Sequence, residues 1–338
     1  MWKEERLESL LNTPTDALIR DAAKIEGDIL VLGAGGKMGP TVCMTAKKAI
    51  DEAGITKRVI AVSRFSDSKT KERLLGCGIE LIEADLLDTK ALYALPDVKN
   101  VIYMAGRKFG TNGEEWKTWS MNAALPAFVA DKYRNSNILV FSSGNIYPPV
   151  AAACGGCSEN NPAAPRGEYA MSCLARERAF EYAARAFGTK ILLYRLNYAV
   201  DLRYGVLCDI AENLAAGKPI NLNTACFNVI WQGTAAEIAI RGLLYCESPA
   251  FTLNVTGPET ISVEHAARRM AEILGVEPLF EGEPQPEAYL SNSGLMVSLF
   301  GYPAVSAETM LTWQAEWFRD GGRRLGKPTH FEERGGVY

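Results

Sequence analysis

The sequence is poor in histidine. Only two of its 338 residues are histidines, His265 and His330, and neither stands at a zinc-binding spacing. The pair Cys154 and Cys157 in "CGGC" would need two further ligands to hold zinc. "FSSGN" does not fit the G-x-S-x-G pattern, and His265 lies inside the helical run "SVEHAARRMAEIL". We therefore expect neither a metal site nor a serine hydrolase.

Net charge and long apolar runs are also scarce. Thirty-six basic against 40 acidic residues give a formal charge of −4, which creates no field that attracts nucleic acid or an anionic membrane. Runs such as "DILVLG" are too short to cross a bilayer, and the charged first 28 residues do not resemble a signal peptide. We expect a cytoplasmic protein with reduced thiols and no nucleic-acid or membrane partner. "CGGC" is either a plain loop or a regulatory dithiol.

Short apolar runs alternate with helical stretches through the first two thirds of the chain. "DILVLG", "RVIAVSR", "NVIYMAG", "NILVFSSG" and "KILLYRL" are almost continuously apolar, which is typical of strands buried on both faces. This alternation predicts an α/β fold, a doubly wound parallel (Rossmann) sheet with a smaller mixed C-terminal substrate lobe. We place a helical arm at 1–26, which covers a sheet edge or a partner chain, the dinucleotide-binding domain at 27–197, and the lobe with the C-terminal tail at 198–338.

Three glycines follow the first predicted strand in "GAGGKMG". Gly33, Gly36 and Gly39 stand between that strand and an alanine-rich helix. A strand, a glycine-rich turn and a helix together form a phosphate site, because glycine lets backbone N–H groups approach a pyrophosphate at the helix N-terminus. We expect a dinucleotide here, with Lys37 and Met38 of the same turn among the cofactor-binding residues.

The end of the second strand indicates which dinucleotide binds. An acidic residue there would bind the ribose hydroxyls of NAD, whereas "AVSRF" places Ser63 and Arg64 where a 2′-phosphate would lie. Asp67 is too far along the loop to replace that acid. The sequence favours NADP, with NAD as the alternative.

Six motifs in order resemble the extended short-chain dehydrogenase/reductases of the NAD-dependent epimerase/dehydratase type over about residues 27–275. They are "GAGGKMG", "ADLLD", "YMAG", "MNA", "FSSGNIY" and "YAMSC". The resemblance implies that Asp85 and Leu86 contact the adenine and that Ala105 and Gly106 lie beside the nicotinamide ribose. It also implies that Asn122 supports the helix of the site, Ser143 hydrogen-bonds the reacting oxygen and Tyr169 transfers the proton. We add Asn145 and Asn197 to the substrate site.

The family's lysine, four residues after the tyrosine, is replaced by Cys173. A thiol on the same helix face brings no positive charge, and a phenol of ordinary pKa is only about 0.1% ionised at pH 7. Arg107, Lys108 and the nicotinamide ring are the candidate replacements, and both side chains would suit a carboxylated substrate. We expect Arg176, two turns along the helix, to be too remote.

Two further departures lie after the sixth strand. Tyr198 stands where the family has asparagine, and Gln232 stands where an acidic pair is common. Both weaken the expectation of a nucleotide sugar as substrate. We expect an NADP-dependent oxidoreductase or epimerase that acts on a sugar, a sugar acid or a related hydroxy or keto compound. The alternative is a catalytically reduced dinucleotide-binding sensor or scaffold protein. The family also implies a homodimer formed by helices at about 114–133 and 168–187.

Overall fold

The fold is built on one parallel sheet. The computed structural model describes residues 1–108, 110–326, 329, 331 and 332. Among these residues, seven strands pair in the order β12-β7-β5-β4-β1-β2-β3, and every pairing is parallel. The strands are β1 (Ile29–Leu32), β2 (Val59–Ser63), β3 (Glu80–Glu83), β4 (Asn100–Tyr103), β5 (Asn137–Ser143), β7 (Lys190–Leu196) and β12 (Phe251–Val255). The predicted doubly wound sheet is confirmed.

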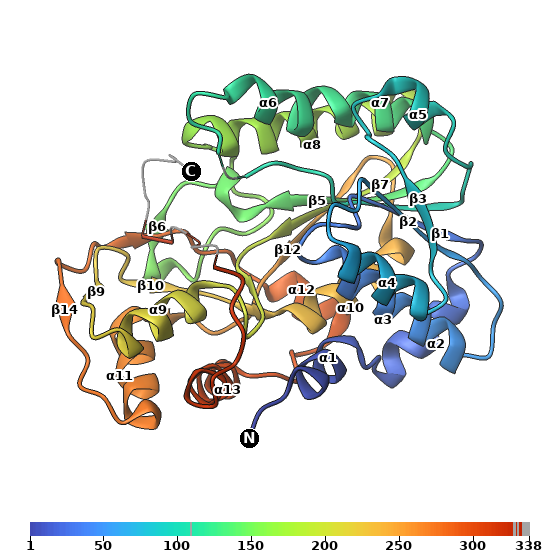
Figure 1. Ribbon diagram of the computed structural model, residues 1–338. Coiled ribbons are helices and arrows are strands. Elements are labelled where there is room, and N and C mark those ends of the chain that lie inside the picture. The colour runs from blue at the N-terminus through green and yellow to red at the C-terminus, as the bar shows by residue number, and fades with distance from the viewer. Residues whose placement is uncertain (109, 327–328, 330, 333–338) are drawn as a thin grey trace.

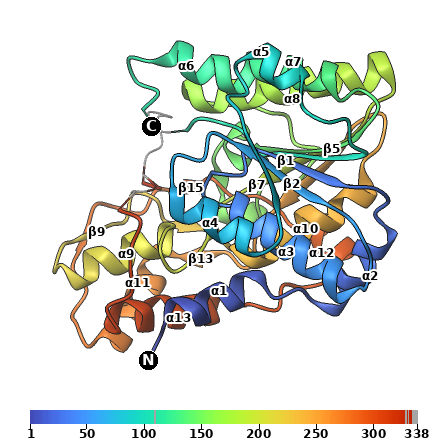
Figure 2. The ribbon, with the colours of Figure 1, turned by 45° about the vertical axis from the view of Figure 1, so that its right-hand side comes forward.

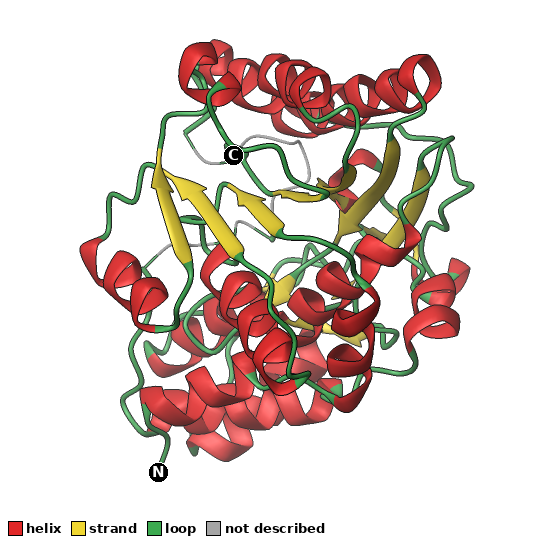
Figure 3. Cartoon of the chain, turned by 90° about the vertical axis from the view of Figure 1, so that its right-hand side faces the viewer, coloured by secondary structure: helices red, strands yellow, loops and turns green. Residues whose placement is uncertain are grey.

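Helices cover both faces of this sheet, which is why the central strands are apolar on both sides (Figures 1 and 3). One face carries α6 (Glu115–Trp119), the π-helical turn Ser120–Ala124, α7 (Leu125–Lys132) and α8 (Gly167–Phe187). The other face carries α3 (Gly39–Glu52), α4 (Ser68–Gly76), α10 (Gln232–Gly242) and α12 (Gly294–Phe300). A short helix, α5 (Thr89–Tyr93), precedes β4. No helix of the described residues is both long and apolar enough to cross a membrane.

The N-terminal arm is helical, as expected, and forms two helices, but it does not cover a sheet edge. α1 (Glu4–Asn12) and α2 (Asp16–Lys24) pack on α3 and α10, outside the helical layer (Figure 2). Trp2, before α1, stacks edge-on against Trp313 and Trp317 of α13 (Ala307–Arg319). The apolar face of the arm is thus buried against helices of the same chain.

The C-terminal lobe has its own apolar core, but residue 197 does not separate it from the sheet. After 197 the chain returns to the sheet, where α10 packs on α3 and β12 forms an edge strand beside β7. The lobe itself contains short strand pairs around α9 (Val206–Ala215) and α11 (Val263–Leu274). Its strands are β8 (Ala199–Val200), β9 (Ile220–Asn221), β10 (Cys226–Phe227), β11 (Ile230–Trp231), β13 (Ile261–Ser262), β14 (Phe280–Glu281) and β15 (Glu287–Ala288). β15 pairs with β6 (Val150–Ala151), which precedes α8 in the chain.

The strand order reverses at β1, which lies between β2 and β4. In open α/β sheets, ligands bind outside the carboxyl ends of the strands at such a switch point. The glycine turn after β1, the loop after β4 and the end of β5 all lie at that edge. The topology therefore brings the sequence motifs together.

Candidate active site

The glycine turn is tightly enclosed by the neighbouring chain. Gly33 has a φ of +88°, and a Cβ there would lie 2.6 Å from the backbone nitrogen of Ala105. A Cβ at Gly39 would lie 2.3 Å from the carbonyl oxygen of Ala34. No other residue fits at either position without moving backbone atoms. Gly35 and Gly36, between these two positions, are exposed just before the N-terminus of α3.

Two cavities meet at this turn. The first, of about 230 Å³, is named here the Arg64 cavity. It is lined by Gly33, Gly35, Gly36, Ser63, Arg64, Phe65, Ser66, Ala84, Asp85, Leu86, Met104, Ala105, Gly106 and Met121. The second, of about 290 Å³, is named the Tyr169 cavity. It is lined by Gly33, Gly36, Lys37, Met38, Gly39, Met104, Lys108, Phe141, Ser142, Ser143, Asn145, Tyr169, Leu196, Asn197, Tyr198, Ala199, Val200, Tyr204, Gly205, Val206 and Thr329. Gly33, Gly36 and Met104 line both, so the two cavities adjoin across the turn.

The Arg64 cavity brings together most of the predicted cofactor residues. Ser63 ends β2, and the exposed Arg64 follows it. Asp67 is not in the cavity, because its carboxylate caps α4 by accepting from the backbone N–H groups of Lys69 and Thr70. Asp85 and the buried Leu86 line the cavity from the loop after β3. Phe65, with a φ of +43°, completes the wall, and no sequence motif predicted it.

Ser143 and Tyr169 line the same cavity from different elements. Ser143 is the last residue of β5, and its Oγ accepts from the backbone N–H of Asn145 at 3.1 Å. Tyr169 lies in the first turn of α8. Burial raises the pKa of the Tyr169 phenol well above its usual value, and the neighbouring Cys173 adds to this. Arg176 and a hydrogen bond with Ser143 act in the opposite direction on that pKa.

Cys173 lies behind Tyr169 and does not line the cavity. Its thiol is fully buried in a small apolar cluster with Ile146, Tyr147 and Cys157. Burial raises the pKa of the Cys173 thiol, so the group is neutral near pH 7. The predicted placement on the face of Tyr169 is what the structure shows, and no charge comes with it.

Asn122 joins the loop after β4 to α8. Its Oδ1 accepts from the backbone N–H of Arg107 at 2.8 Å and from Nη2 of Arg176 at 2.9 Å. Its Nδ2 donates to the carbonyl of Arg107 at 2.8 Å and to Oγ of Ser172 at 3.0 Å. All four bonds are made inside the protein, since Asn122 is fully buried.

Two expectations about charge are corrected here. The Arg107 guanidinium lines neither cavity, because it pairs with Glu114 at 2.6 Å and donates to the carbonyl of Gly110 at 2.7 Å. Arg176, expected to be too remote, is buried beside the site and donates to Asn122. Side chains on a helix lean towards its N-terminus, so a long arginine reaches back by about one turn.

Two lysines line the Tyr169 cavity. Lys108 Nζ lies 5.8 Å from the centre of the Tyr169 ring, and burial lowers the pKa of this lysine to about 8. Lys37 leaves the glycine turn towards the lobe, where its Nζ donates to the carbonyl of Ala199 at 3.0 Å and lies 3.8 Å from the ring centre of Tyr204. Burial lowers the pKa of Lys37 to about 8 as well.

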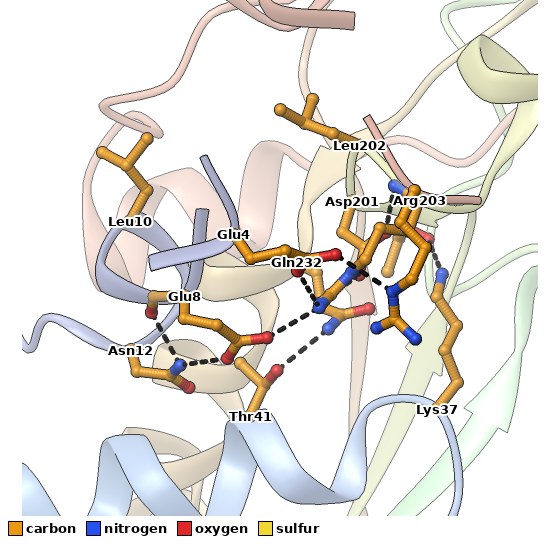
Figure 4. Close-up of polar contacts among 12 residues, drawn as sticks. Glu4, Glu8, Leu10, Asn12, Lys37, Thr41, Asp201, Leu202, Arg203 and Gln232 are labelled. Atoms are coloured by element: carbon orange, nitrogen blue, oxygen red, sulfur yellow. Dashed lines mark hydrogen bonds and ion pairs between the residues drawn. The ribbon is translucent and has the colours of Figure 1, made fainter. Parts of the chain in front are cut away.

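The lobe supplies cavity residues that sequence motifs missed. Tyr198, with a φ of +45°, and Tyr204 line the Tyr169 cavity beside the predicted Asn197. Just behind Lys37, Arg203 pairs with Asp201 of the same loop and with Glu8 of α1 (Figure 4). The N-terminal arm therefore reaches the back of the site, and no local pattern in the sequence indicated it.

The two cysteines of "CGGC" differ in exposure. Cys154 is exposed, whereas Cys157 is buried and its backbone N–H donates to the carbonyl of Leu290 at 2.9 Å. The Cys157 carbonyl accepts from Nδ2 of Asn254 at 2.8 Å. His265 lies exposed on α11, and His330 is outside the described residues. Among the described residues no cluster of three or more His, Cys, Asp or Glu could hold a metal ion.

Comparison with protein-family models matches residues 29–221 to the NAD dependent epimerase/dehydratase family. The chain belongs to this family. It is thus an enzyme of the oxidoreductase, epimerase and dehydratase type with a nicotinamide dinucleotide as its cofactor. The matched range contains the glycine turn, Ser143 and Tyr169. No curated protein matches the chain.

Solved structures of three sugar-nucleotide epimerases share the fold. The UDP-Glc/GlcNAc 4-epimerase from Campylobacter jejuni is 19% identical, with a TM-score of 0.70 over 88% of this chain and 100% of that chain. The UDP-glucuronic acid 4-epimerase from Bacillus cereus, in complex with NAD, is 16% identical, with a TM-score of 0.69 over 87% and 99%. The UDP-glucose 4-epimerase from Thermus thermophilus, also in complex with NAD, is 18% identical, with a TM-score of 0.69 over 86% and 99%. At these identities the likeness concerns the fold.

Proposed function

We propose that the protein transfers hydride between NADP and a hydroxyl or keto carbon of an acidic, carbohydrate-derived substrate, with Tyr169 as the acid/base. The observation that carries this proposal is that Ser143 and Tyr169 line one cavity, which adjoins the glycine turn. Hydride transfer at a carbinol carbon requires a positioned proton acceptor and a second hydrogen-bond donor at the same oxygen. Those two side chains have the required chemistry.

The residues of the two cavities fit an extended dinucleotide. The close packing of Gly33 and Gly39, with the exposed Gly35 and Gly36 before the start of α3, suits a pyrophosphate at this helix N-terminus. Arg64 would bind a 2′-phosphate in a charge-assisted contact, and Asp85 with Leu86 would border the adenine. When bound, the nicotinamide supplies the acceptor or donor of the hydride. The solved structures in complex with NAD favour the other dinucleotide, so Arg64 is the decisive residue.

The side chains of this protein handle the proton. Tyr169 accepts the proton that the substrate hydroxyl loses on oxidation and returns it on reduction, while the Ser143 hydroxyl holds the same oxygen. Phe141, Leu196 and Val206 add apolar surface to the lining of the cavity beside these polar groups.

The two half-buried lysines of the Tyr169 cavity support an acidic substrate. Lys37 and Lys108 line the cavity that holds Ser143 and Tyr169, and each ammonium can hydrogen-bond a carboxylate or a phosphate. The proteins with a similar fold include a UDP-glucose 4-epimerase and a UDP-glucuronic acid 4-epimerase. We propose that the protein prefers an acidic carbohydrate to the neutral carbohydrate that otherwise matches it.

A matched panel of substrates tests the proposal. Reduction of NADP⁺ is followed with D-glucuronate against D-glucose and with UDP-glucuronic acid against UDP-glucose. We expect the acid of a pair to be turned over with a KM at least tenfold lower than that of the neutral sugar. Lys108→Met should remove this difference, while Lys218→Met, which changes an exposed lysine on the lobe, should preserve it. Equal use of acid and neutral sugars by the unchanged protein would contradict the substrate class.

The second candidate function is binding of the dinucleotide without catalysis. The uncharged Cys173 and the raised pKa of Tyr169 favour a protein that binds the dinucleotide as a sensor or scaffold. Tight NADP binding without turnover of any hydroxy or keto compound would support this alternative.

We also propose a homodimer formed by α6, α7 and α8. Large apolar side chains are exposed on these helices, which the family resemblance places at an interface, among them Trp116, Phe128, Tyr182 and Phe187. Exposed apolar clusters of this kind are typical of interaction surfaces. Light scattering should give twice the 36.9 kDa chain mass for the unchanged protein and the monomer mass for Phe128→Lys/Tyr182→Lys. A monomer for the unchanged protein at micromolar concentration would contradict the dimer.

A further inference from the structure

We propose that Arg176 is the positioning residue that supplies, from the next turn of α8, the positive charge that Cys173 lacks. This inference rests on the proposed role of Tyr169. It concerns a side chain that lines neither cavity and acts through the phenol and through Asn122.

The side chain of Arg176 extends back along α8 to Asn122. Nδ2 of Asn122 donates to the hydroxyl of Ser172, which donates to the carbonyl of Tyr169 at 2.8 Å. Residues seven positions apart lie on one face of a helix, and side chains lean towards the N-terminus. The guanidinium is buried, with Nη1 donating to the carbonyl of Phe141 at 2.7 Å and Nη2 donating to Oδ1 of Asn122 at 2.9 Å. Its third donor, Nε, is buried with no hydrogen-bond partner among the described residues. The cation is therefore fixed between β5 and the π-helical turn that holds Asn122.

The loop after β4 is shaped around this cation. A Cβ at Gly106 would lie 2.8 Å from Nη2 of Arg176 and 3.2 Å from Oδ1 of Asn122. Gly106 also lines the Arg64 cavity, so the guanidinium lies directly behind the wall of the proposed cofactor site. Glycine at this position lets the charge approach the cavity without entering it.

Other charged groups leave the charge of Arg176 uncancelled. The nearest acid on α8 is Glu177, which is fully buried and accepts from Nε and Nη2 of Arg195 at 3.0 and 2.8 Å. Glu177 also accepts from the hydroxyl of Ser142 at 2.5 Å. The remaining titratable neighbours are the neutral Cys173 and Tyr103, with Lys108 as a second cation. Arg176, Arg195 and Glu177 together thus leave one positive charge behind Tyr169.

This charge favours the ionised phenol of Tyr169. A cation near a phenol stabilises the phenolate and so lowers its pKa, in opposition to the burial that raises it. The same guanidinium holds Asn122, which fixes the backbone of the loop at Arg107. Removal of the charge should leave the phenol harder to ionise, and oxidation should then require a higher pH.

The test compares the pH profile of substrate oxidation across four variants of the full-length protein. Arg176→Gln removes the charge but keeps a donor for Asn122 or Phe141, and Arg176→Lys keeps the charge. Arg176→Gln/Cys173→Lys returns a cation to the position that the family uses. Arg178→Gln is the matched control, because Arg178 is on the same helix, exposed, and pairs with Glu181. A second readout, independent of turnover, is ¹³Cζ-tyrosine NMR of Tyr169 in the NADP⁺ complex, assigned with Tyr169→Phe.

We expect Arg176→Gln to lower kcat at pH 7 about 10- to 100-fold and to move the rise of kcat upward by about one to two pH units. The Tyr169 phenol, followed by its NMR resonance, should ionise at a correspondingly higher pH. Arg176→Lys and the double variant should restore both readouts, and Arg178→Gln should change neither. An unshifted profile and resonance in Arg176→Gln, or a double variant that is not rescued, would overturn the inference. Failure of the proposed function is distinct from this, since Tyr169→Phe would then retain full turnover.

Discussion

The two cavities that meet at the glycine turn are built in different ways. The Arg64 cavity is lined largely by three glycines of the turn and by residues that end or directly follow β2, β3 and β4. The Tyr169 cavity depends on long side chains from the glycine turn, the loop after β4, α8 and the lobe. The conformation of a backbone turn depends on the residues of the turn itself. The position of a long side chain depends on the distant elements that it contacts. The comparison shows why motifs describe the first cavity well and the second only in part.

The largest effect on the Arg64 cavity is expected from a substitution in the glycine turn. Gly33→Ala places a methyl group 2.6 Å from the backbone nitrogen of Ala105 at a φ of +88°, so the turn must move. We expect NADPH affinity to fall at least 100-fold, which corresponds to about 2.7 kcal/mol. Fluorescence titration of NADPH measures this. Gly76→Ala is the control, because a Cβ there meets nothing within 4 Å. Unchanged NADPH affinity in Gly33→Ala would show that the dinucleotide lies elsewhere.

A smaller effect is expected from substitution of Arg64, which lines the same cavity. Arg64→Ala removes the proposed partner of the 2′-phosphate, so NADP⁺ affinity should fall about tenfold or more, or by at least about 1.4 kcal/mol. NAD⁺ affinity should stay within twofold, because NAD⁺ lacks that phosphate. Calorimetric titration with both dinucleotides measures the two affinities. A preference for NAD⁺ in the unchanged protein would contradict the assignment of NADP.

Binding of an acidic substrate in the Tyr169 cavity should depend on pH. Lys37 and Lys108 have pKa values lowered to about 8, so both lose their charge as the pH rises through 8. Binding of an acidic substrate needs the protonated amines and should weaken by roughly tenfold between pH 8 and pH 9. The KM for the acid, measured from pH 6.5 to 9.5, reports this. In Lys108→Met the dependence should be shallower, and a flat profile in the unchanged protein would separate these lysines from the substrate.

Sequence patterns predicted the fold and singled out most residues that line the Arg64 cavity, because both follow from local rules. The apolar strands, the spacing of Gly33, Gly36 and Gly39, and the break after Ser63 are properties of adjacent residues. The parallel sheet then brings their loops to one edge. The motif positions Ser143 and Tyr169 also meet in one cavity, as the resemblance implied. What each of them does there stays a prediction.

The side-chain contacts that the sequence did not predict depend on the length of the side chains and on residues far apart in the chain. Arg107 follows directly after the loop motif, yet its guanidinium turns to Glu114. Arg176 is two turns from Tyr169 in the sequence, yet its length and the lean of helical side chains bring it to Asn122. The contact of Glu8 with Arg203 joins residues 195 positions apart. No periodicity or spacing encodes such pairs.

The most direct measurement compares hydride transfer to NADP⁺ by the unchanged protein and by Tyr169→Phe on the best acid of the substrate panel. The substitution removes only the phenolic hydroxyl, whose proton transfer is worth about 10²- to 10⁴-fold in rate. We predict that turnover falls by at least 100-fold, while NADP⁺ affinity changes less than threefold and the unfolding midpoint is retained. Turnover within threefold of the unchanged protein would contradict the account.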